Sequence, residues 1–336
     1  MKILAIESSC DETAAAVVED GRRALSGVVR TQIPLHAVYG GVVPEIASRA
    51  HTEAIASVCE KALADANCTM EEIDAVAVTN RPGLVGALLV GVSFAKSLAY
   101  RYRLPLYGIN HLRGHIAAAY LMDPALKPPF HALILSGGHT FLARVNGYTD
   151  FTLIGTTRDD AAGEAFDKVA RVLNIPYPGG RELQNMADAY TGEELYPLPS
   201  PALKEDPFDF SFSGLKTAVV NLAHNLAQKG ETLDGNKLAA SFTRTVQEGL
   251  KNRLKNVLET EDVETLVFAG GVAANTGLRT ALGNFCDEYC IRFLPVDVSL
   301  CGDNAAMIGA QAYYEAQNGV PAELTLNAVP RAEVNE

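Results

Sequence analysis

Two segments of the chain repeat one layout, and this repetition constrains the fold more than any other feature. Residues 3–30 (ILAIESSCDETAAAVVEDGRRALSGVVR) alternate three apolar runs with a polar turn and a glycine turn. Residues 132–157 (ALILSGGHTFLARVNGYTDFTLIGTT) do the same, with a strand at Ala132–Leu135 and Asn146-Gly147 as a hairpin signal. Helix-like segments and parallel-type strands follow the two meanders, with the strands expected at Ala75–Thr79, Pro105–Ile109 and Thr265–Ala269. The repetition predicts an α/β protein with a duplicated β-β-β-α-β-α unit and two lobes of mixed sheet flanked by helices.

Helical periodicity predicts four helices around these strands. They are expected at Glu45–Ala64, Leu84–Tyr100, Asp159–Leu173 and Asp303–Asn318. The last two begin with aspartates, which the exposed amide groups of a helix N-terminus favour. We expect the proline-rich stretch 196–208 to be a loop and the segment after Gly319 to be poorly anchored.

The composition is that of a chain with a large hydrophobic core. The 336 residues allow about two domains of roughly 150 residues each, and 48% of them are hydrophobic against 20% charged, which excludes a mostly disordered chain. The longest apolar stretch, 83–95, is too short for the roughly 18 to 20 residues that span a bilayer, and MKILAIESSCDE has three acidic residues and no signal-peptide h-region. We therefore expect a cytoplasmic protein without membrane contact, whose six unpatterned cysteines are free thiols.

The net charge of −12 excludes nucleic-acid wrapping by the whole surface, but the charge is unevenly distributed. Residues 1–120 hold 11 basic and 12 acidic residues, and the remainder holds 17 and 28. No acidic residue lies within 75–122, which is either an apolar segment with a few solvated bases or a local anion-facing surface. Its five basic residues are Arg81, Lys96, Arg101, Arg103 and Arg113.

His111 and His115 are candidate metal ligands because, on a helix, residues four apart lie on one face. Gly114 between them weakens the helix, so two unrelated histidines at a turn remain an alternative. Leucine follows His111, so the glutamate of an H-E-x-x-H peptidase motif is missing. Asp303 is the candidate third ligand, with a helix N-cap as its alternative role.

Two glycine loops follow apolar strands, at 133–140 and 266–275. Neither is a Walker loop or a G-x-G-x-x-G motif, but together they suggest a nucleotide held between lobes, with tight packing turns as the alternative. Asp11, Glu12 and Asp167 lie where they could bind a ribose hydroxyl or a metal, or simply cap helices. Gly179 and Gly180 form another site of close backbone approach.

Taken together, the motifs resemble those of the universal tRNA threonylcarbamoyladenosine transferase family, and the chain is similar to its bacterial members. The motifs occur in the family's order from about residue 3 to residue 310. They are ESSCDET, YGGVVPEIASRAH, PGLVGALLVG, H-x-x-G-H, SGGHT, DDAAGEAFDKVAR, YPGG, FSFSGLKT and AGGVAAN.

The resemblance implies a two-lobed actin/sugar-kinase/chaperone-ATPase-like fold with a duplicated ribonuclease-H-like core and an inter-lobe cleft. We expect an N-terminal lobe at 1–108, completed by a C-terminal helix at about 304–320, and a C-terminal lobe at 109–303. The implied reaction transfers threonylcarbamoyl from threonylcarbamoyl-adenylate to N6 of adenosine 37, forming t6A and releasing AMP. The tRNAs concerned read codons that begin with A.

The resemblance also implies site residues and partners. One divalent metal, iron (Fe2+) or else zinc (Zn2+), would be held by His111, His115 and Asp303. Gln184 stands where family members often carry an aspartate, so one ribose or base contact is in doubt. Asp11 is our candidate for orienting or deprotonating the attacking amine. The expected partners are tRNA, a shorter paralogous protein of the same fold and a small P-loop ATPase. The residues expected to line the adenylate site are Ile134, Leu135, Ser136, Gly137, Gly138, Asp167, Gly180 and Asn275.

Three other functions remain open from the residues alone. The histidine pair permits a metallo-endopeptidase, although the base glutamate is missing. The fold permits a sugar-kinase-like phosphotransferase. An actin-like nucleotide-binding scaffold is also possible, but it leaves the histidines and Asp303 without a task.

Overall fold

The computed structural model describes residues 1–201 and 206–336, which form two compact units. Unit 1 comprises Met1–Pro129, Val145–Thr152 and Ser299–Glu336, and unit 2 comprises Phe130–Arg144 and Leu153–Val298. Part of the proline-rich stretch at 196–208 lies outside the described residues. The lobes at 1–108 with 304–320 and at 109–303 stay a prediction.

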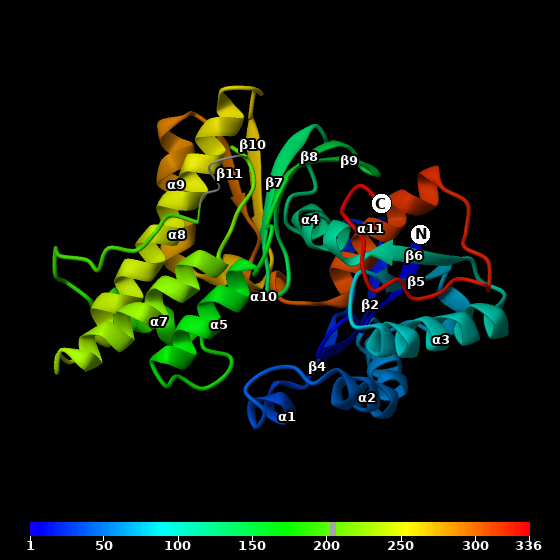
Figure 1. The fold of residues 1–336 in the computed structure, drawn as a ribbon. Helices are drawn as coiled ribbons and strands as arrows, with labels where there is room; N and C mark the ends of the chain where they lie inside the picture. The colour runs from blue at the N-terminus through cyan, green and yellow to red at the C-terminus, as the bar shows by residue number, and fades with distance from the viewer. Residues whose placement is uncertain (202–205) are drawn as a thin grey trace. The chain divides into compact units, whose positions relative to one another are not determined.

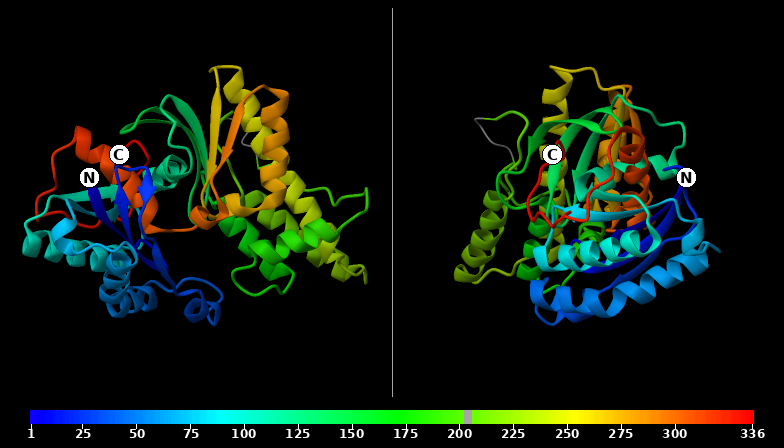
Figure 2. Two further views of the ribbon diagram at one scale, coloured as in Figure 1. Left: turned by 180° about the vertical axis from the view of Figure 1, so that it is seen from behind. Right: turned by 90° about the vertical axis from the view of Figure 1, so that its right-hand side faces the viewer.

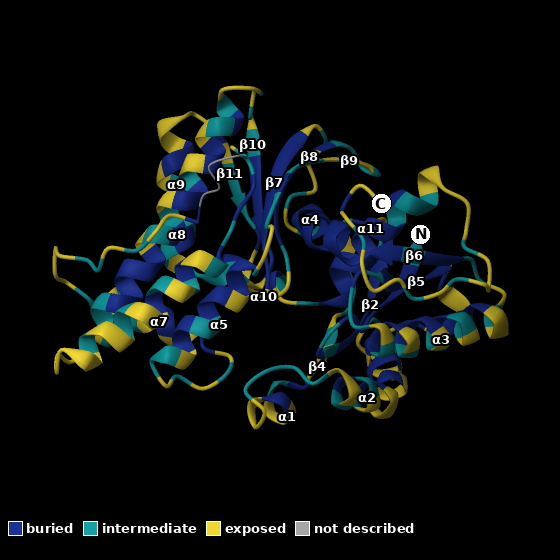
Figure 3. Ribbon diagram, in the orientation of Figure 1, coloured by how far each residue is buried: buried dark blue, intermediate teal, exposed yellow. Residues whose placement is uncertain are grey.

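Unit 1 contains a mixed sheet in the order β3-β2-β1-β5-β6, with β4 also paired to β2 (Figure 1). β1 and β2 are antiparallel, whereas β5 and β6 are parallel to their neighbours. The central strands are apolar and small, and they are buried along most of their length (Figure 3). The strands are β1 (Lys2–Glu7), β2 (Glu12–Glu19), β3 (Arg23–Ala24), β4 (Val28–Thr31), β5 (Ala75–Arg81) and β6 (Leu106–Asn110).

Helices cover this sheet on both faces. Successive side chains of a strand point to opposite faces, so strands that are apolar throughout need cover on both. Leu4 and Ile6 of β1 belong to apolar clusters formed with the α2 and α3 side of the sheet. On the other face α11 lies so close that a Cβ at Gly309 would be 2.6 Å from Val18 Cγ2. The helices of unit 1 are α1 (Ile33–Ala37), α2 (Pro44–Asp65), η1 (Met70–Glu72), α3 (Val85–Tyr102), α4 (His111–Met122) and α11 (Ala305–Asn318).

Unit 2 has the same topology, which confirms the duplication predicted from the sequence. Its sheet runs β11-β10-β7-β8-β9. The meander β7-β8-β9 is again followed in the chain by two parallel strands, which extend the sheet from β7. The strands are β7 (Phe130–Leu135), β8 (Thr140–Gly147), β9 (Asp150–Thr156), β10 (Thr265–Ala269) and β11 (Arg292–Pro295), of which β8 and β9 extend into residues 145–152 of unit 1. The helices are α5 (Ala162–Val172), α6 (Gly180–Ala189), α7 (Ser213–Gln228), α8 (Gly235–Leu258), η2 (Gly271–Ala274) and α9 (Thr276–Glu288), and α10 (Val298–Cys301) spans the boundary at which unit 1 resumes. None of the helices in the described residues is long and apolar enough to cross a membrane.

Two predicted boundaries are wrong: the start of one helix and the position of one hairpin turn. Helix α5 begins at Ala162 rather than Asp159, because the Asp159 carboxylate accepts hydrogen bonds from the backbone N–H groups of Phe212 and Ser213 at the start of α7. The turn between β8 and β9 lies at Tyr148-Thr149 rather than Asn146-Gly147, which continue β8.

The segment after Gly319 is well anchored, contrary to the prediction. It runs along β5, β6 and α3 and is drawn in red in Figures 1 and 2. The Val329 N–H donates to the Asn80 carbonyl at 2.8 Å, and the Asn110 amide donates to the Glu333 carbonyl at 2.7 Å. Val334 is 1% exposed. The polar sequence of the segment concealed this, because its backbone makes most of these bonds.

Candidate functional site

Helix α4 presents His111 and His115 from its first two turns. Asn110 ends β6 and caps the helix, its side-chain oxygen accepting from the Leu112 N–H at 2.8 Å. His111 is therefore the first helical residue, and the two buried rings lie with their centroids 4.6 Å apart. The helical arrangement of the pair is confirmed, and Gly114 does not prevent it.

Asp303 lies against both histidines. Its Oδ1 is 3.4 Å from Nε2 of His111 and 3.4 Å from Nε2 of His115. The N-cap alternative for Asp303 is wrong, because Asn304 caps α11 by accepting from the Met307 N–H at 3.0 Å. The predicted start of that helix at Asp303 is therefore two residues early.

The close approach of α4 to α11 explains the glycine between the histidines. A Cβ at Gly114 would lie 2.7 Å from Cδ1 of the buried Ile308. Glycine at this position lets the helix that carries the two imidazoles pack directly against the helix that follows Asp303.

Glu7 is a residue of this cluster that the sequence reasoning missed. Its buried carboxylate accepts from Nδ1–H of His111 at 2.9 Å, from the Thr79 hydroxyl at 2.6 Å and from the Ser9 N–H at 2.5 Å. A carboxylate on the rear nitrogen fixes the tautomer of a ligand histidine and turns Nε2 toward the metal position. The available signal was an acidic residue ending the otherwise apolar strand β1.

Electrostatics at this cluster follow from burial and opposite charge. Burial lowers the pKa of His111, but Asp303 and Glu7 together hold it well above its ordinary value. Burial raises the pKa of Asp303, but the two imidazoles hold it well below its usual range. For His115 burial prevails, so its pKa is lowered and the neutral imidazole, the form that binds metals, is favoured.

The donor set fits a divalent cation. Within the described residues, both ring nitrogens of His115 are buried and make no hydrogen bond, an arrangement that costs free energy unless another group occupies the position. One ligand atom from each of His111, His115 and Asp303 lies within 4.8 Å of the other two. These three residues form a possible metal site inside unit 1.

Asp11 ends the turn that follows β1, and Glu12 begins β2 in the same unit. Asp11 is 8% exposed, and its backbone carbonyl accepts from the Gln32 N–H at 3.0 Å. Burial and the nearby charges of Asp11 and Asp303 raise the pKa of Glu12 to about 9. Carboxylates therefore gather on this side of the metal ligands.

In unit 2 the two glycine loops lie side by side. Gly270, with φ of +92°, follows β10, and a Cβ on it would be 2.4 Å from the Leu135 carbonyl oxygen. Gly163 of α5 packs on the other loop, its N–H donating to the Ser136 carbonyl at 3.1 Å. A Cβ at Gly137 or Gly138 would meet open space, and both residues are exposed, so this loop is open to solvent.

The other predicted adenylate residues surround these loops. The Asp167 carboxylate accepts from the Gly179 N–H at 2.9 Å, and burial raises its pKa. The Asn275 side chain caps α9 by accepting from the Leu278 N–H at 2.9 Å. Gln184 is buried and donates to Asp188 at 2.5 Å, while its Oε1 has no partner among the described residues.

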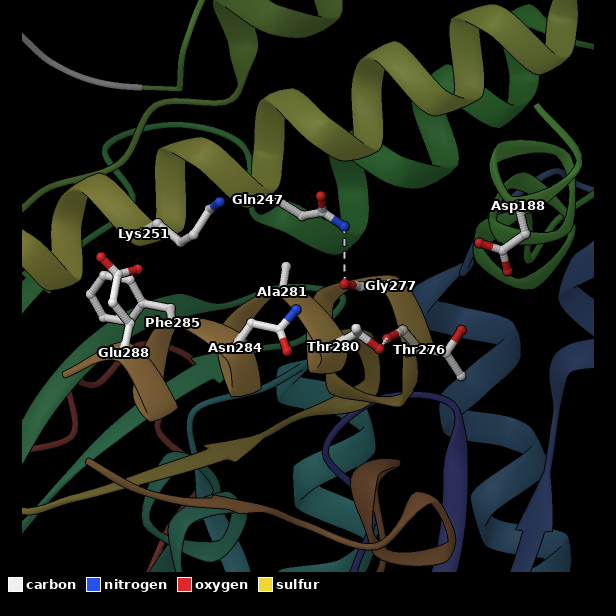
Figure 4. A pocket seen from close by; sticks show the side chains of 10 residues that line it. All are labelled: Asp188, Gln247, Lys251, Thr276, Gly277, Thr280, Ala281, Asn284, Phe285 and Glu288. Carbon is white, nitrogen blue, oxygen red and sulfur yellow. Dashed lines mark hydrogen bonds between the residues drawn. The ribbon is translucent and has the colours of Figure 1, made fainter. Parts of the chain in front are cut away.

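A cavity of about 530 Å³ adjoins this region, between α6, α8 and α9 (Figure 4). Among the lining residues, the Gln247 amide donates to the Gly277 carbonyl at 2.9 Å (Figure 4). Its lining is polar, with Asp188, Lys251 and Glu288 among the residues that face it.

Comparisons with known proteins agree with this geometry. A family profile described as tRNA N6-adenosine threonylcarbamoyltransferase (TsaD) matches residues 23–310. A curated relative of that name from Enterococcus faecalis is 50% identical over 330 residues, covering 98% of this chain and 94% of the relative. Another of that name from Clostridium novyi is 48% identical over 336 residues, covering 100% and 98%.

Solved structures support the fold. Component A of (R)-2-hydroxyglutaryl-CoA dehydratase from Acidaminococcus fermentans aligns with a TM-score of 0.58 at 16% identity, covering 94% of this chain and 99% of that one. A ROK family glucokinase from Streptomyces griseus aligns with a TM-score of 0.50 at 12% identity, covering 93% and 98%. The predicted actin/sugar-kinase-like fold class is confirmed. The chain is a transferase and belongs to the tRNA N6-adenosine threonylcarbamoyltransferase family.

Proposed function

We propose that this chain transfers the threonylcarbamoyl group of threonylcarbamoyl-adenylate to N6 of adenosine 37 in tRNAs that read codons beginning with A. AMP leaves, and t6A is formed. The observation that carries the proposal is the His111, His115 and Asp303 cluster backed by Glu7, in a chain whose whole length matches the family.

The three ligand residues would hold one divalent metal. Two imidazoles and one carboxylate suit Fe2+ in particular, with Zn2+ as the alternative. When bound, the metal supplies a Lewis acid for the phosphate or carbonyl oxygen of the adenylate. Glu7 fixes the orientation of His111, and the neutral state of His115 keeps its Nε2 free to bind.

Unit 2 residues would bind the adenylate. Gly137 and Gly138, exposed at the end of the Ile134–Gly138 loop, would offer their backbone N–H groups to a phosphate oxygen. Asp167 holds the Gly179-Gly180 turn in place, and Asn275 starts the helix beside the second glycine loop. Gln184 offers an amide oxygen where the family often has a carboxylate, so its ribose contact would be uncharged.

The attacking amine is a poor nucleophile because its lone pair is delocalised into the purine ring. AMP is a good leaving group from a mixed anhydride, so no covalent enzyme intermediate is required. Positioning of the two substrates would then supply most of the rate enhancement, worth up to about 7 to 11 kcal/mol. Asp11 would orient the amine or accept its proton.

We also propose the partners that the family implies: a shorter paralogue of the same fold and a small P-loop ATPase. An acidic chain that must hold a polyanion gains from such partners. A tRNA substrate would place the reaction in the cytoplasm.

The test is direct. The chain, its partners, threonylcarbamoyl-adenylate and an unmodified tRNA transcript should yield the t6A nucleoside by mass spectrometry. His111→Ala should lose metal retention and product together, because one of three ligands is gone. His224→Ala, an exposed histidine of α7, is the matched control and should retain both.

Full transfer by His111→Ala after chelation would contradict the metal role. The rival functions have their own readouts in the same mixture: cleavage of a peptide substrate for an endopeptidase, and ATP turnover without tRNA for a phosphotransferase. If either activity appears and no modified nucleoside is formed, the proposed function is wrong.

A further inference from the structure

One surface segment of unit 1, residues 28–43, buries polar side chains and exposes apolar ones. Between residues 28 and 43 the only buried side chains are the polar Gln32 and His36. The large apolar side chains face solvent instead: Val29 is 48% exposed, Leu35 50%, Val38 82% and Tyr39 64%. In most proteins large apolar side chains are buried and polar ones are exposed, so this distribution is reversed. Exposed apolar side chains that lie together mark interaction sites.

Buried polar contacts hold the segment firmly. His36 Nε2–H donates to Gln32 Oε1 at 3.2 Å, and its Nδ1 accepts from the Val43 N–H at 3.3 Å. The Gln32 side chain also donates to the Ala47 carbonyl at 3.4 Å. Because the loop is fixed from the inside, its apolar side chains are presented outward on a supported platform. We call Val29, Leu35, Val38 and Tyr39 the α1 platform.

The α1 platform lies next to the candidate reaction centre within unit 1. The Gln32 N–H donates to the Asp11 carbonyl at 3.0 Å, and strand β4 pairs with β2 so that Thr31 lies opposite Glu12. Asp11 and Asp303 are both near enough to Glu12 to raise its pKa. The platform therefore adjoins, through Thr31 and Gln32, the turn that carries Asp11.

Charge favours RNA over an acidic or neutral protein as the occupant. No acidic residue occurs from 21 to 44, and Arg30 lies directly beside Val29 of the platform in β4. Arg30 is exposed and makes no ion pair within the part of the chain that the structure describes. Nucleobases are uncharged and flat, so they suit an exposed tyrosine ring bordered by aliphatic side chains.

We propose that the α1 platform is a stacking surface for the bases of the anticodon loop that flank the target adenosine, with Tyr39 as the principal contact. This rests on the proposed function. Stacking there would hold the loop open and leave the target base free to enter the site. Tyr39 is a binding residue for the nucleic-acid substrate and takes no part in the chemistry.

The experiment measures binding of an anticodon stem-loop RNA, with an unmodified adenosine at position 37, by fluorescence anisotropy. Tyr39→Ala should weaken binding about tenfold, the usual range for loss of one base–aromatic stack. Tyr39→Phe keeps the ring and should bind nearly as the wild type does. Tyr289→Ala, which removes a 40% exposed tyrosine of unit 2, should bind unchanged. Thermal unfolding of each variant checks that the fold is retained.

A second RNA, abasic at the two positions flanking the adenosine, separates stacking from other effects. Wild type and Tyr39→Ala should bind it equally weakly. Equal binding of the intact stem-loop by both proteins would overturn the proposal. So would a Tyr39→Ala variant that binds the abasic RNA about tenfold more weakly than the wild type does, the same loss as on the intact RNA. Loss of a partner protein with unchanged RNA binding would make the platform a protein-docking surface, and would also overturn it.

The wild-type modification assay keeps the two proposals apart. If the wild type forms the modified nucleoside and Tyr39→Ala does so with an unchanged KM for tRNA, only the stacking surface is wrong. If the wild type neither modifies nor binds RNA, the proposed function is wrong and the platform proposal is overturned with it.

Discussion

At the scale of single residues, Glu7 is the side chain whose replacement tells most about the metal centre. One of its oxygens accepts from the Ser9 N–H, and the other from the Thr79 hydroxyl and from His111. Glu7→Gln replaces one oxygen by an amide group, which sets a donor against a donor. We expect metal affinity to fall by about 10- to 100-fold, the usual cost of losing a partner behind a ligand histidine.

Competition between the protein and a chelator for Zn2+ measures this change. The control is Glu45→Gln, because among the described residues Glu45 pairs only with Arg49, and both side chains are exposed. An unchanged affinity in Glu7→Gln would mean that packing alone orients His111.

His51 makes a pH-dependent contribution to folding. Its buried ring accepts from the Thr13 hydroxyl through Nδ1 at 2.7 Å and donates from Nε2 to the Cys10 carbonyl at 2.9 Å. Burial lowers its pKa against the opposing charges of Glu7 and Asp11. Below about pH 6.5 the unfolded chain therefore takes up a proton before the folded one does, and stability falls as pH falls until the folded pKa is passed.

We expect His51→Gln to remove this component, so that the wild type loses more stability than the variant between about pH 7.5 and 5.5. Urea unfolding at the two pH values measures the difference. His224→Gln, at an exposed position of α7, should follow the wild type. Identical pH slopes in wild type and His51→Gln would refute the assignment.

At the scale of elements, the contact of α11 with the unit 1 sheet sets the position of Asp303. A Cβ at Gly309 would lie 2.6 Å from Cγ2 and 2.8 Å from Cβ of Val18, a branched side chain with little freedom to move. Gly309→Ala should therefore push α11 outward and lower the free energy of unfolding by about 1 to 3 kcal/mol.

Chemical denaturation measures this effect, and Gly214→Ala is the matched control. A Cβ at Gly214 in α7 meets open space, so alanine there should leave stability unchanged or raise it by up to about 1 kcal/mol. Equal effects of the two substitutions would show that helix propensity, rather than the packing of α11 on the sheet, decides the outcome.

Strands were predictable because their apolar runs are short and bounded by turns, and β10 was placed at its observed residues, 265–269. Helix starts were less predictable, since an aspartate near a helix can cap a different one. Asp159 caps α7 instead of starting α5, and Asn304 rather than Asp303 caps α11. Long-range backbone bonds, such as those of the segment after Gly319, leave no local pattern in the sequence.

At the scale of the whole molecule, the duplication was visible because both sheets repeat a meander followed by parallel strands. The candidate ligands were visible as a spaced pair and a distant aspartate. Their convergence was not, because it depends on the approach of α4 to α11 across the glycine at 114. Glu7 was missed because only the sheet register brings the end of β1 behind His111.

The net charge of −12 makes RNA binding by this chain depend on local basic groups. Arg101 and Arg103 at the end of α3 are both exposed and make no ion pair within the described residues, and they border a cavity of about 600 Å³. If they meet tRNA phosphates, Arg101→Glu with Arg103→Glu should weaken binding. The slope of log Kd against log salt concentration should also fall by about one unit for each phosphate that is no longer neutralised.

Titrations of tRNA at several salt concentrations measure both quantities. Lys229→Glu with Lys255→Glu, a double reversal at exposed positions of unit 2, controls for the change in net charge. Stacking on Tyr39 involves no counterion release, so Tyr39→Ala should lower affinity while leaving the slope intact. The salt dependence of binding thus distinguishes the two surfaces, because only the arginine variant should change the slope. An unchanged slope and affinity in the arginine variant would exclude α3 from the tRNA interface and leave the acid-free stretch at 75–122 as an ordinary solvated face.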